Sequence, residues 1–304
     1  MKTSTKSYSM IYIHGLMLLM VALVASSFPV GALITSELPP EIMMLVRFLL
    51  AALLFSPYVF FKNGWHLPTR EKLAVYAVLS VPLVVFFWCM FEGLRYTTAL
   101  NTGAIYTLVP TITAFYVFLL NRERPGKWRF LGLLIGTSGA LWIVFRGDLS
   151  AFVQMKLNHG DALFLLGCLF LGAYNPLIKK FYTGEAMEVM TFWVISFGSV
   201  WLLLLSIPTL STVAWRDVQS SVYLGILYLA LFTTLATFFL LQIGTLMLGA
   251  TRVAAYSFLT PAFVVIINLI SGVDMFQWQL LPGILLVLLA MFLVQMQDGL
   301  TQAR

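Results

Sequence analysis

The chain has 304 residues, of which 61% are hydrophobic and only 10% are charged, and its formal net charge is +6. Soluble domains carry roughly 25% charged residues, so this composition excludes a soluble globular protein. Because multi-span membrane proteins concentrate Lys and Arg on their cytoplasmic loops, the positive balance is that of such a protein and does not indicate a nucleic-acid partner.

Ten apolar segments predict membrane-spanning helices, because a hydrocarbon core about 30 Å thick needs about 20 mostly apolar residues per helix. None of the segments alternates as the strands of a membrane β-barrel do. In chain order they are 11–34, 41–61, 73–96, 99–120, 128–146, 160–179, 187–207, 221–243, 252–271 and 278–297. The sequence therefore predicts an all-α membrane protein with ten transmembrane helices.

The basic residues predict the orientation of these helices. With the N-terminus inside, three of the 18 Lys and Arg residues lie in outer loops and two lie within or at the ends of helices, which leaves thirteen at the inner ends. The three outer residues are Arg146, Lys156 and Arg216. An excess of Lys and Arg marks the cytoplasmic side. We therefore expect a multi-pass protein of the cell (inner) membrane with cytoplasmic N- and C-termini.

The same pattern occurs twice in the chain. A shift of 151 residues lays Gly93 on Gly244, Pro110 on Pro261 and Gly132 on Gly283, and a shift of 147 pairs Pro29 with Pro176 and Glu41 with Glu188. Each copy holds five predicted spans, an odd number, so the second copy must be inverted relative to the first. Inverted repeats are the usual build of secondary transporters, with the substrate site at the repeat interface. We expect repeats at 1–147 and 160–297 around a central cavity.

Several stretches resemble EamA-type proteins of the drug/metabolite transporter superfamily. They are ALVASSFPVGAL in the first span, PPEIMMLVRFLLAALLF in the second, ALNTGAIYTLVPTITAFYVFLLNRERPGKWRFLGLLIGTSGALWIV in the fourth and fifth, and GATRVAAYSFLTPAFVVIINLISGVDMFQWQLLPGILLVLLAMFLV near the end. The resemblance implies two inverted five-helix repeats, a site between the first, third, fourth, sixth, eighth and ninth spans, and export of small metabolites. One departure is Val194, which stands where the symmetry of the halves would place a counterpart of Arg47.

Four prolines inside the predicted spans are candidate helix breaks: Pro29, Pro110, Pro176 and Pro261. Each removes an amide donor and frees the carbonyl group four residues earlier. In a bilayer such carbonyl groups must be satisfied by neighbouring helices, side chains or cavity water. We expect these prolines to border the cavity or to act in gating; the alternative is an ordinary membrane kink.

Arg47 and Glu92 are candidate coupling or ion-pair residues, because ionisable groups inside spans usually face the protein interior or a wet cavity. Both are expected roughly 8 Å below the outer edge, from the helical rise of about 1.5 Å per residue. One interpretation is a structural pair, either between the two or between Glu92 and Arg95. The other makes Glu92 a proton-titrating group or a partner for a substrate amine, and Arg47 a partner for a substrate carboxylate.

Aromatic and polar side chains within the spans supply further candidates for the cavity lining. With Glu92 included, these candidates are Trp88, Glu92, Tyr106, Tyr174, Asn175, Phe239, Gln242 and Tyr256. Apolar walls with a few polar groups suit organic solutes, although aromatic stripes in spans also pack against lipid. A separate stripe of Gly132, Gly136 and Gly139 predicts close helix packing, with a dimer surface as one setting.

The motifs that the chain lacks bear on its function. It has no phosphate-binding Gly-rich loop, no His or Cys spacing typical of a metal site, and no Ser/His/Asp arrangement. The sequence therefore predicts a non-enzymatic secondary transporter without cofactor or metal, exporting amino acids, aromatic ones among them, or drug-like cations by alternating access. Protons or facilitated diffusion remain open for coupling, and monomer or homodimer for assembly. The alternatives are an intramembrane enzyme and a non-transporting sensor or scaffold.

Overall fold

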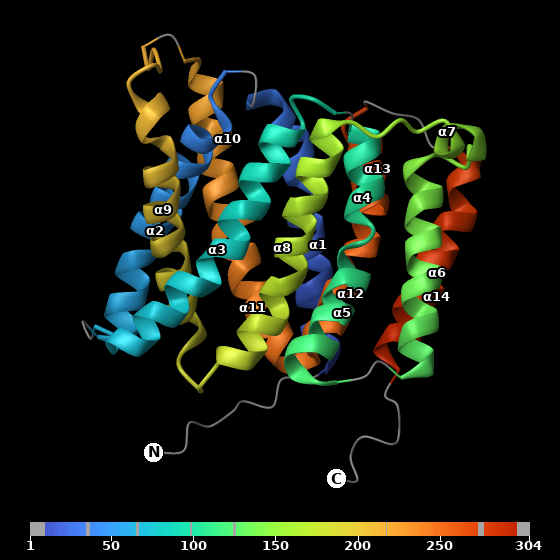
Figure 1. Cartoon of the computed structure of the whole chain (residues 1–304), viewed down its shortest axis with the longest axis horizontal. Coiled ribbons are helices and arrows are strands. Elements are labelled where there is room, and N and C mark those ends of the chain that lie inside the picture. The colour runs from blue at the N-terminus through green and yellow to red at the C-terminus, as the bar shows by residue number, and fades with distance from the viewer. Residues whose placement is uncertain are drawn as a thin grey trace.

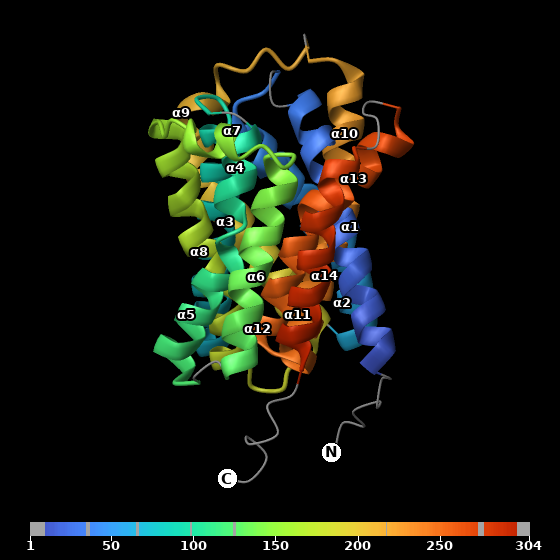
Figure 2. The same cartoon turned by 90° about the vertical axis from the view of Figure 1, so that its right-hand side faces the viewer.

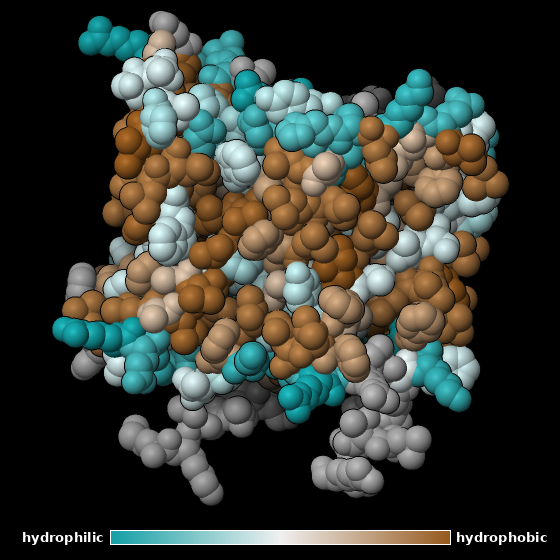
Figure 3. Space-filling view, viewed as in Figure 1, coloured by the Kyte–Doolittle hydropathy of each residue, from teal (hydrophilic) through white to brown (hydrophobic). Residues whose placement is uncertain are grey.

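The computed structural model describes residues 10–34, 37–64, 67–97, 99–123, 126–216, 218–272 and 277–296. In these ranges every regular element is helical, as the composition predicts. The helices stand side by side in one bundle (Figure 1). Apolar side chains cover the middle of its surface and hydrophilic ones gather at its two ends (Figure 3). This belt is the surface expected of a protein surrounded by a bilayer.

The helices follow one another with short connections. The first half contains α1 (Met10–Ile34), α2 (Pro40–Asn63), α3 (Arg70–Gly93), α4 (Ala99–Tyr106), α5 (Val109–Asn121), α6 (Lys127–Val144) and the short α7 (Leu149–Val153). The second half contains α8 (His159–Phe181), α9 (Met187–Leu210), α10 (Ser220–Ala230), the π-helix η1 (Leu231–Ala236), α11 (Thr237–Leu248), α12 (Ala250–Ala255), the 3-10 helix η2 (Tyr256–Leu259), α13 (Thr260–Ile270), the 3-10 helix η3 (Trp278–Leu280) and α14 (Leu281–Gln295).

Nine helical segments of the described chain are long and apolar enough to cross a membrane, and they coincide with nine of the ten predicted spans. The predicted span 128–146 forms α6, an 18-residue helix that is not among the nine. Its first turn contains Lys127 and Arg129, which shorten its apolar stretch. A tenth crossing therefore remains a prediction.

Helix α1 begins and helix α14 ends at the same end of the bundle, the lower one in Figures 1 and 2. We call this end the terminal face. It also holds the connections from α2 to α3, from α5 to α6 and from α8 to α9 (Figure 1). Residues 1–9 and 297–304 lie outside the described ranges, so the cytoplasmic location of the termini remains a prediction.

Two of the four prolines occur where a span is interrupted. The fourth span is divided between α4 and α5, and Pro110 lies in the first turn of α5. The ninth span is divided by η2, and Pro261 lies in the first turn of α13. By contrast, α1 and α8 run through Pro29 and Pro176 without the predicted break. A proline fixes a backbone angle close to the helical one, so a single lost hydrogen bond does not have to end a helix in a packed bundle.

The glycine stripe packs inside the chain. A Cβ atom on Gly139 would lie 2.9 Å from the carbonyl oxygen of Gly283 on α14, and one on Gly132 would lie 2.7 Å from a methyl group of Val294. One on Gly136 would lie 2.5 Å from the ring of Phe258. These glycines therefore bring α6 against α14 and η2, so the stripe does not form the surface for a second copy that the sequence suggests.

Candidate functional site

A cavity of about 100 Å³, taken as the volume open to the centre of a water molecule, lies between helices of both halves. Its walls come from α1, α2, α3, α8 and the interrupted fourth, eighth and ninth spans. The walls thus include all six spans that the family resemblance implies around a site, the first, third, fourth, sixth, eighth and ninth. Helix α2, the second span, also contributes. The cavity is the candidate functional site.

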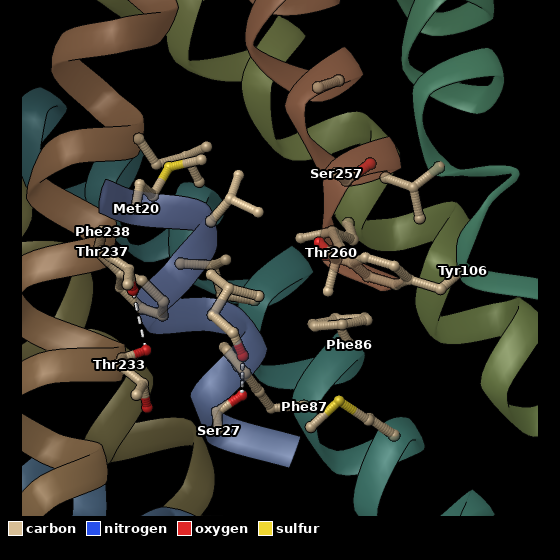
Figure 4. A pocket seen from close by; sticks show the side chains of 18 of the residues that line it. Met20, Ser27, Phe86, Phe87, Tyr106, Thr233, Thr237, Phe238, Ser257 and Thr260 are labelled. Carbon is tan, nitrogen blue, oxygen red and sulfur yellow. Dashed lines mark hydrogen bonds between the residues drawn. The ribbon is translucent and has the colours of Figure 1, made fainter. Parts of the chain in front are cut away.

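The helix interruptions supply much of the polar lining. Tyr106 ends α4, Ser257 belongs to η2, Thr260 begins α13 and Thr233 belongs to η1, and all four face the cavity (Figure 4). Irregular backbone at membrane depth is tolerated where it is buried in protein or lines a wet cavity. The interruptions therefore place short polar side chains in the middle of an otherwise apolar bundle.

Arg47 is the charged residue among the described residues that line the cavity, and only 1% of its surface is exposed. Its Nη2 atom donates to the carbonyl oxygen of Thr233 at 2.8 Å and to the Thr233 hydroxyl at 2.9 Å, and Nε donates to the Thr234 hydroxyl. The guanidinium lies over the ring of Phe87, 4.8 Å from its centre. The ion pairs found among the described residues do not include Arg47.

The π-helix η1 explains why Arg47 finds its partners at this position. π-helical turns have i→i+5 hydrogen bonds and often occur at functional sites. Here the Thr233 carbonyl oxygen accepts from both Arg47 and the Thr237 hydroxyl, the latter at 2.9 Å. The eighth span thus holds the α2 guanidinium through its backbone as well as through its side chains.

An aromatic wall leads away from Arg47. The Phe87 ring lies 5.1 Å from Phe86, and Phe86 lies 6.3 Å from Tyr106, measured between ring centres. Phe238 stacks on Phe87 at 5.9 Å. In Figure 4, Thr233 and Phe238 lie on one side of the cavity and Tyr106 lies on the other. The cavity therefore has a charged end and a hydroxyl-rich end joined by aromatic rings.

Three polar atoms of the lining are buried without a hydrogen-bond partner among the residues that the structure describes: the Asn175 Oδ1 atom and the hydroxyl oxygens of Ser257 and Thr260. Buried polar atoms in native proteins are almost always paired with protein, water or ligand. Ser257 and Thr260 lie beside Tyr106 in Figure 4. This end of the cavity is therefore suited to water or to a polar group of a bound solute.

Two of the predicted cavity residues bond to each other outside the lining. The Gln242 side chain donates to the Tyr174 hydroxyl at 3.1 Å, and its oxygen accepts from the Thr191 hydroxyl. All three residues are buried, and they join α8, α9 and α11. Their geometry is that of a satisfied polar network, which fixes three helices around the site.

Glu92 lies away from the cavity. Its carboxylate accepts from Arg95 at 3.1 Å and from the Tyr96 hydroxyl at 3.1 Å, and the Arg95 side chain is 55% exposed. Of the pairings considered from the sequence, the structure shows the one with Arg95. Arg47 and Glu92 are therefore not brought together.

The remaining predicted residues are distributed around the bundle. Tyr106 and Asn175 line the cavity, as Arg47 does. The Tyr256 hydroxyl is hydrogen-bonded to the His14 ring outside the lining. Phe239 packs against another aromatic ring, and the partly exposed Trp88 is not among the lining residues.

Sequence reasoning missed most of the aromatic wall and the threonines of η1. The lining residues not predicted include Phe28, Phe86, Phe87, Thr233, Thr237, Phe238 and Thr260. The threonines had a signal, since three of them occur within residues 233–237 of an apolar span. The phenylalanines had none, because a phenylalanine that faces a cavity and one that faces lipid look alike in sequence.

Ion pairs join the helices at the terminal face. Lys62 of α2 lies 2.9 Å from Glu188 of α9, and Lys72 of α3 lies 3.5 Å from Glu185. Burial alone would raise the pKa of Glu185, but hydrogen bonds from Thr183 and the charge of Lys72 hold that pKa below its ordinary value. At this end of the bundle, ion pairs thus link α2 to α9 and α3 to the segment leading into α9.

The described residues hold no cluster of three or more His, Cys, Asp or Glu that could bind a metal ion. The two cysteines, Cys89 and Cys168, are buried and unpaired. The site therefore offers hydrogen-bonding groups, one cation and aromatic surface.

An apolar belt, a bundle of spans and a central cavity define the class of protein as a multi-pass membrane protein built around an internal site. The model of the EamA-like transporter family matches residues 11–145 and 158–296. The chain belongs to this family and is a membrane transporter.

Similar proteins agree with that assignment. YyaM of Bacillus subtilis, described as an uncharacterized transporter, is 25% identical over 80% of each chain. An uncharacterized transporter of Archaeoglobus fulgidus is 26% identical over 83% of this chain and 86% of its own. A WAT1-related protein of Arabidopsis thaliana is 31% identical over 31% of each chain. One crystal structure matches with a TM-score of 0.76 at 15% identity, covering 92% of this chain and 97% of the other, which shows a shared fold.

Proposed function

We propose that this protein is a secondary transporter that exports small organic metabolites across the cell membrane by alternating access. The observation that carries the proposal is the cavity, whose walls come from both halves and whose polar groups lie at helix interruptions. Interrupted helices at the interface of two repeats are a common substrate site in secondary transporters. Export is carried over from the family resemblance.

Reciprocal contacts support an inverted repeat. A Cβ on Gly132 would lie 3.1 Å from the carbonyl oxygen of Ala290, and one on Gly283 would lie 2.8 Å from the carbonyl oxygen of Gly139. The 151-residue shift turns one contact into the other, because it carries Gly132 to Gly283 and Gly139 to Ala290. This exchange is what a twofold axis between α6 and α14 would produce. We therefore assign α6 as the tenth span, antiparallel to α14.

A second pair of contacts follows the same symmetry. Gly93 of α3 packs against Phe164 of α8, and Gly244 of α11 packs against Met17 of α1. The 151-residue shift carries Gly93 to Gly244, and the 147-residue shift carries Met17 to Phe164. Contacts in a separate part of the bundle thus also support the two predicted repeats, 1–147 and 160–297.

We assign the terminal face to the cytoplasm, in keeping with the basic residues of the inner loops. In alternating access this face must open for the solute to enter from inside. The pairs Lys62–Glu188 and Lys72–Glu185 cross between α2, α3 and the segment leading into α9, so opening would have to separate them. We propose that they form the cytoplasmic gate.

The lining favours facilitated diffusion over proton exchange. The described lining residues include no carboxylate and no histidine that could carry a proton through the cavity. Glu92, the candidate proton carrier, is bonded to Arg95 and Tyr96 away from the site. We therefore propose that the solute gradient itself drives transport.

The test is flux in proteoliposomes of the full chain, with a panel of organic acids, amino acids and lipophilic cations, each with and without a pH gradient. We expect saturable flux of at least one solute without product formation, at a rate that the pH gradient does not change. Flux equal to that of protein-free liposomes for the whole panel would contradict transport. A rate that follows the pH gradient would contradict facilitated diffusion.

A further inference from the structure

We infer that the transported solute is an organic monoanion, with its carboxylate on Arg47 and an aromatic or apolar body along the Phe86–Phe87 wall. The inference deepens the proposed function and rests on it for transport. The assignment of charge to the site rests on the geometry of the cavity alone. It is narrower than the sequence prediction, which allowed amino acids and drug-like cations.

The charge of the site favours an anion. Buried charges in proteins are normally paired, and those within membrane spans most of all. Arg47 is 1% exposed, and the ion pairs of the described chain do not include it. Its hydroxyl, carbonyl and ring partners are all uncharged. A bound anion would supply the missing counter-charge.

The Arg47 guanidinium also has N–H groups that its partners do not use. A guanidinium has five N–H groups, arranged to bind a carboxylate through two parallel bonds. The groups on Nε and Nη2 are occupied by Thr233 and Thr234. The Nη1 atom has two N–H groups, and its contact is the sulfur of Met44 at 3.9 Å, a weak acceptor. Donor capacity therefore remains for a ligand.

A cationic group of a solute would find no counter-charge among the described lining residues. Carboxylates near the ends of the helices already have partners. Glu185 and Glu188 form ion pairs with lysines at the terminal face. The Asp161 carboxylate accepts hydrogen bonds from Thr97 and Asn101. None of the described carboxylates lines the cavity. An amine would add a second positive charge beside Arg47. A zwitterion would leave the site with a net positive charge, whereas a monoanion makes it neutral.

The rest of the cavity fits the body of such a solute. Phe86, Phe87 and Phe238 provide flat apolar surface beside Arg47. The unpartnered oxygens of Ser257 and Thr260 lie at the other end, beside Tyr106. A neutral polar group on the far side of the solute would satisfy these atoms. The preferred ligand is therefore an aromatic or apolar monocarboxylate with room for a distal hydroxyl or carbonyl group.

The test uses four probes on one skeleton: 3-phenylpropionate, its neutral amide, phenylalanine and 3-phenylpropylamine. Binding to the purified full chain is measured by calorimetry, and flux is measured in proteoliposomes. We expect the acid to bind about ten- to a hundredfold more tightly than the amide, as charge-assisted hydrogen bonds do. Phenylalanine should bind more weakly than the acid, and the amine most weakly. An acid that binds no better than the amide or the amine overturns the inference.

The matched variants are Arg47→Met at the site and Arg95→Met on an exposed pair. If Arg47 binds the carboxylate, Arg47→Met lowers the ratio of acid to amide affinity to about one, and Arg95→Met leaves it unchanged. An Arg47→Lys variant, which keeps the charge, should retain part of the preference and covers the case in which Arg47→Met does not fold. If Arg47 serves only to hold η1, acid and amide affinities fall together, and the inference is wrong.

The two proposals fail in different ways. Binding of the acid without flux contradicts transport and leaves the anion site standing. Flux of phenylalanine or the amine in preference to the acid contradicts the anion site and leaves transport standing.

Discussion

Arg47 shows how the two halves of the chain differ. Its symmetry counterpart, Val194, is fully buried and apolar. The single cation of the site thus belongs to the first half, whereas Thr233 and Thr234, which hold it, belong to the second. On the proposed repeat, a symmetric scaffold would therefore carry an asymmetric site. The charge could be noticed in the sequence, but its partners could not, because they lie more than 180 residues away.

We predict that the Tyr174–Gln242 hydrogen bond stabilises the fold but does not contribute to solute binding. Replacing Tyr174 with Phe leaves the buried Gln242 side chain without one acceptor, so we expect a loss of about 1 kcal/mol in unfolding free energy. The affinity of the best-bound solute should not change, because Tyr174 lies outside the lining. Thermal unfolding and calorimetry measure the two quantities. Tyr116→Phe is the control, since the Tyr116 hydroxyl makes no hydrogen bond within the described chain. A decrease in affinity of tenfold or more would show that Tyr174 takes part in solute binding.

Glu92 gives a second prediction at this scale. In its pair with Arg95 the arginine side chain is 55% exposed, and surface pairs of this kind contribute about 0–1 kcal/mol. We therefore expect Glu92→Gln to change thermal stability little and to leave the rate and pH dependence of flux unchanged. Proteoliposome flux at several pH values is the measurement. If this variant lost its pH dependence while the wild type kept one, Glu92 would belong to the mechanism.

Among the elements, the helices were predictable and their interruptions only in part. Runs of about 20 apolar residues define a span whatever their order. Pro110 and Pro261 marked two interruptions, because a proline cannot donate the bond that continues a helix. The π-helix η1 has no such mark, since its sequence, LFTTLA, is compatible with an ordinary apolar helix. Its backbone accepts a hydrogen bond from Arg47, which lies on another helix.

The contact between α6 and α14 leads to a prediction about packing. A Cβ on Gly139 would lie 2.7 Å from Leu286 and 2.9 Å from the Gly283 carbonyl oxygen. This oxygen belongs to the backbone of α14, so it cannot easily shift to make room. We expect Gly139→Ala to destabilise the protein by about 1–3 kcal/mol, as overpacking does. Gly15→Ala is the matched control, because nothing lies within 4 Å of its Cβ position. Thermal unfolding of both variants in detergent checks this, and equal stability of the two would argue against a tight α6–α14 contact.

For the whole molecule, the sequence predicted the doubling and the central cavity better than the residues in it. Repeated glycines and prolines fix where helices cross, so the scaffold leaves a trace in the sequence. The lining depends on how each helix is rotated, and in a chain with 25 phenylalanines the sequence does not encode which of them face inward. Tyr106 and Asn175 were found because each carries a polar group near a repeated proline, whereas the side chains of Phe86 and Phe238 are apolar.

The Lys72–Glu185 pair at the terminal face gives a prediction about pH. The pKa of Glu185 lies below its ordinary value of 4.5, so its pair with Lys72 contributes stability above that pH and loses the contribution as the pH falls further. We expect the contribution of this pair to thermal stability to stay constant from pH 7 to 5 and to decrease below pH 4.5. The loss should be at most about 1 kcal/mol, because Lys72 is half exposed. Glu185→Gln should lower stability at pH 7 and flatten the fall. A variant with the same acid profile as the wild type would remove Glu185 from this contact.

The central claim is that a small organic solute crosses the membrane through the cavity between the two halves. The most direct measurement is flux of the best-transported solute of the panel in proteoliposomes, compared between the wild type and Thr260→Phe. Thr260 is buried, lines the cavity and has an unpartnered hydroxyl, so the larger side chain would fill the solute's space. The account predicts saturable flux for the wild type and for Gly15→Ala, and flux reduced at least about tenfold for a folded Thr260→Phe. Flux through Thr260→Phe at the wild-type rate would contradict it.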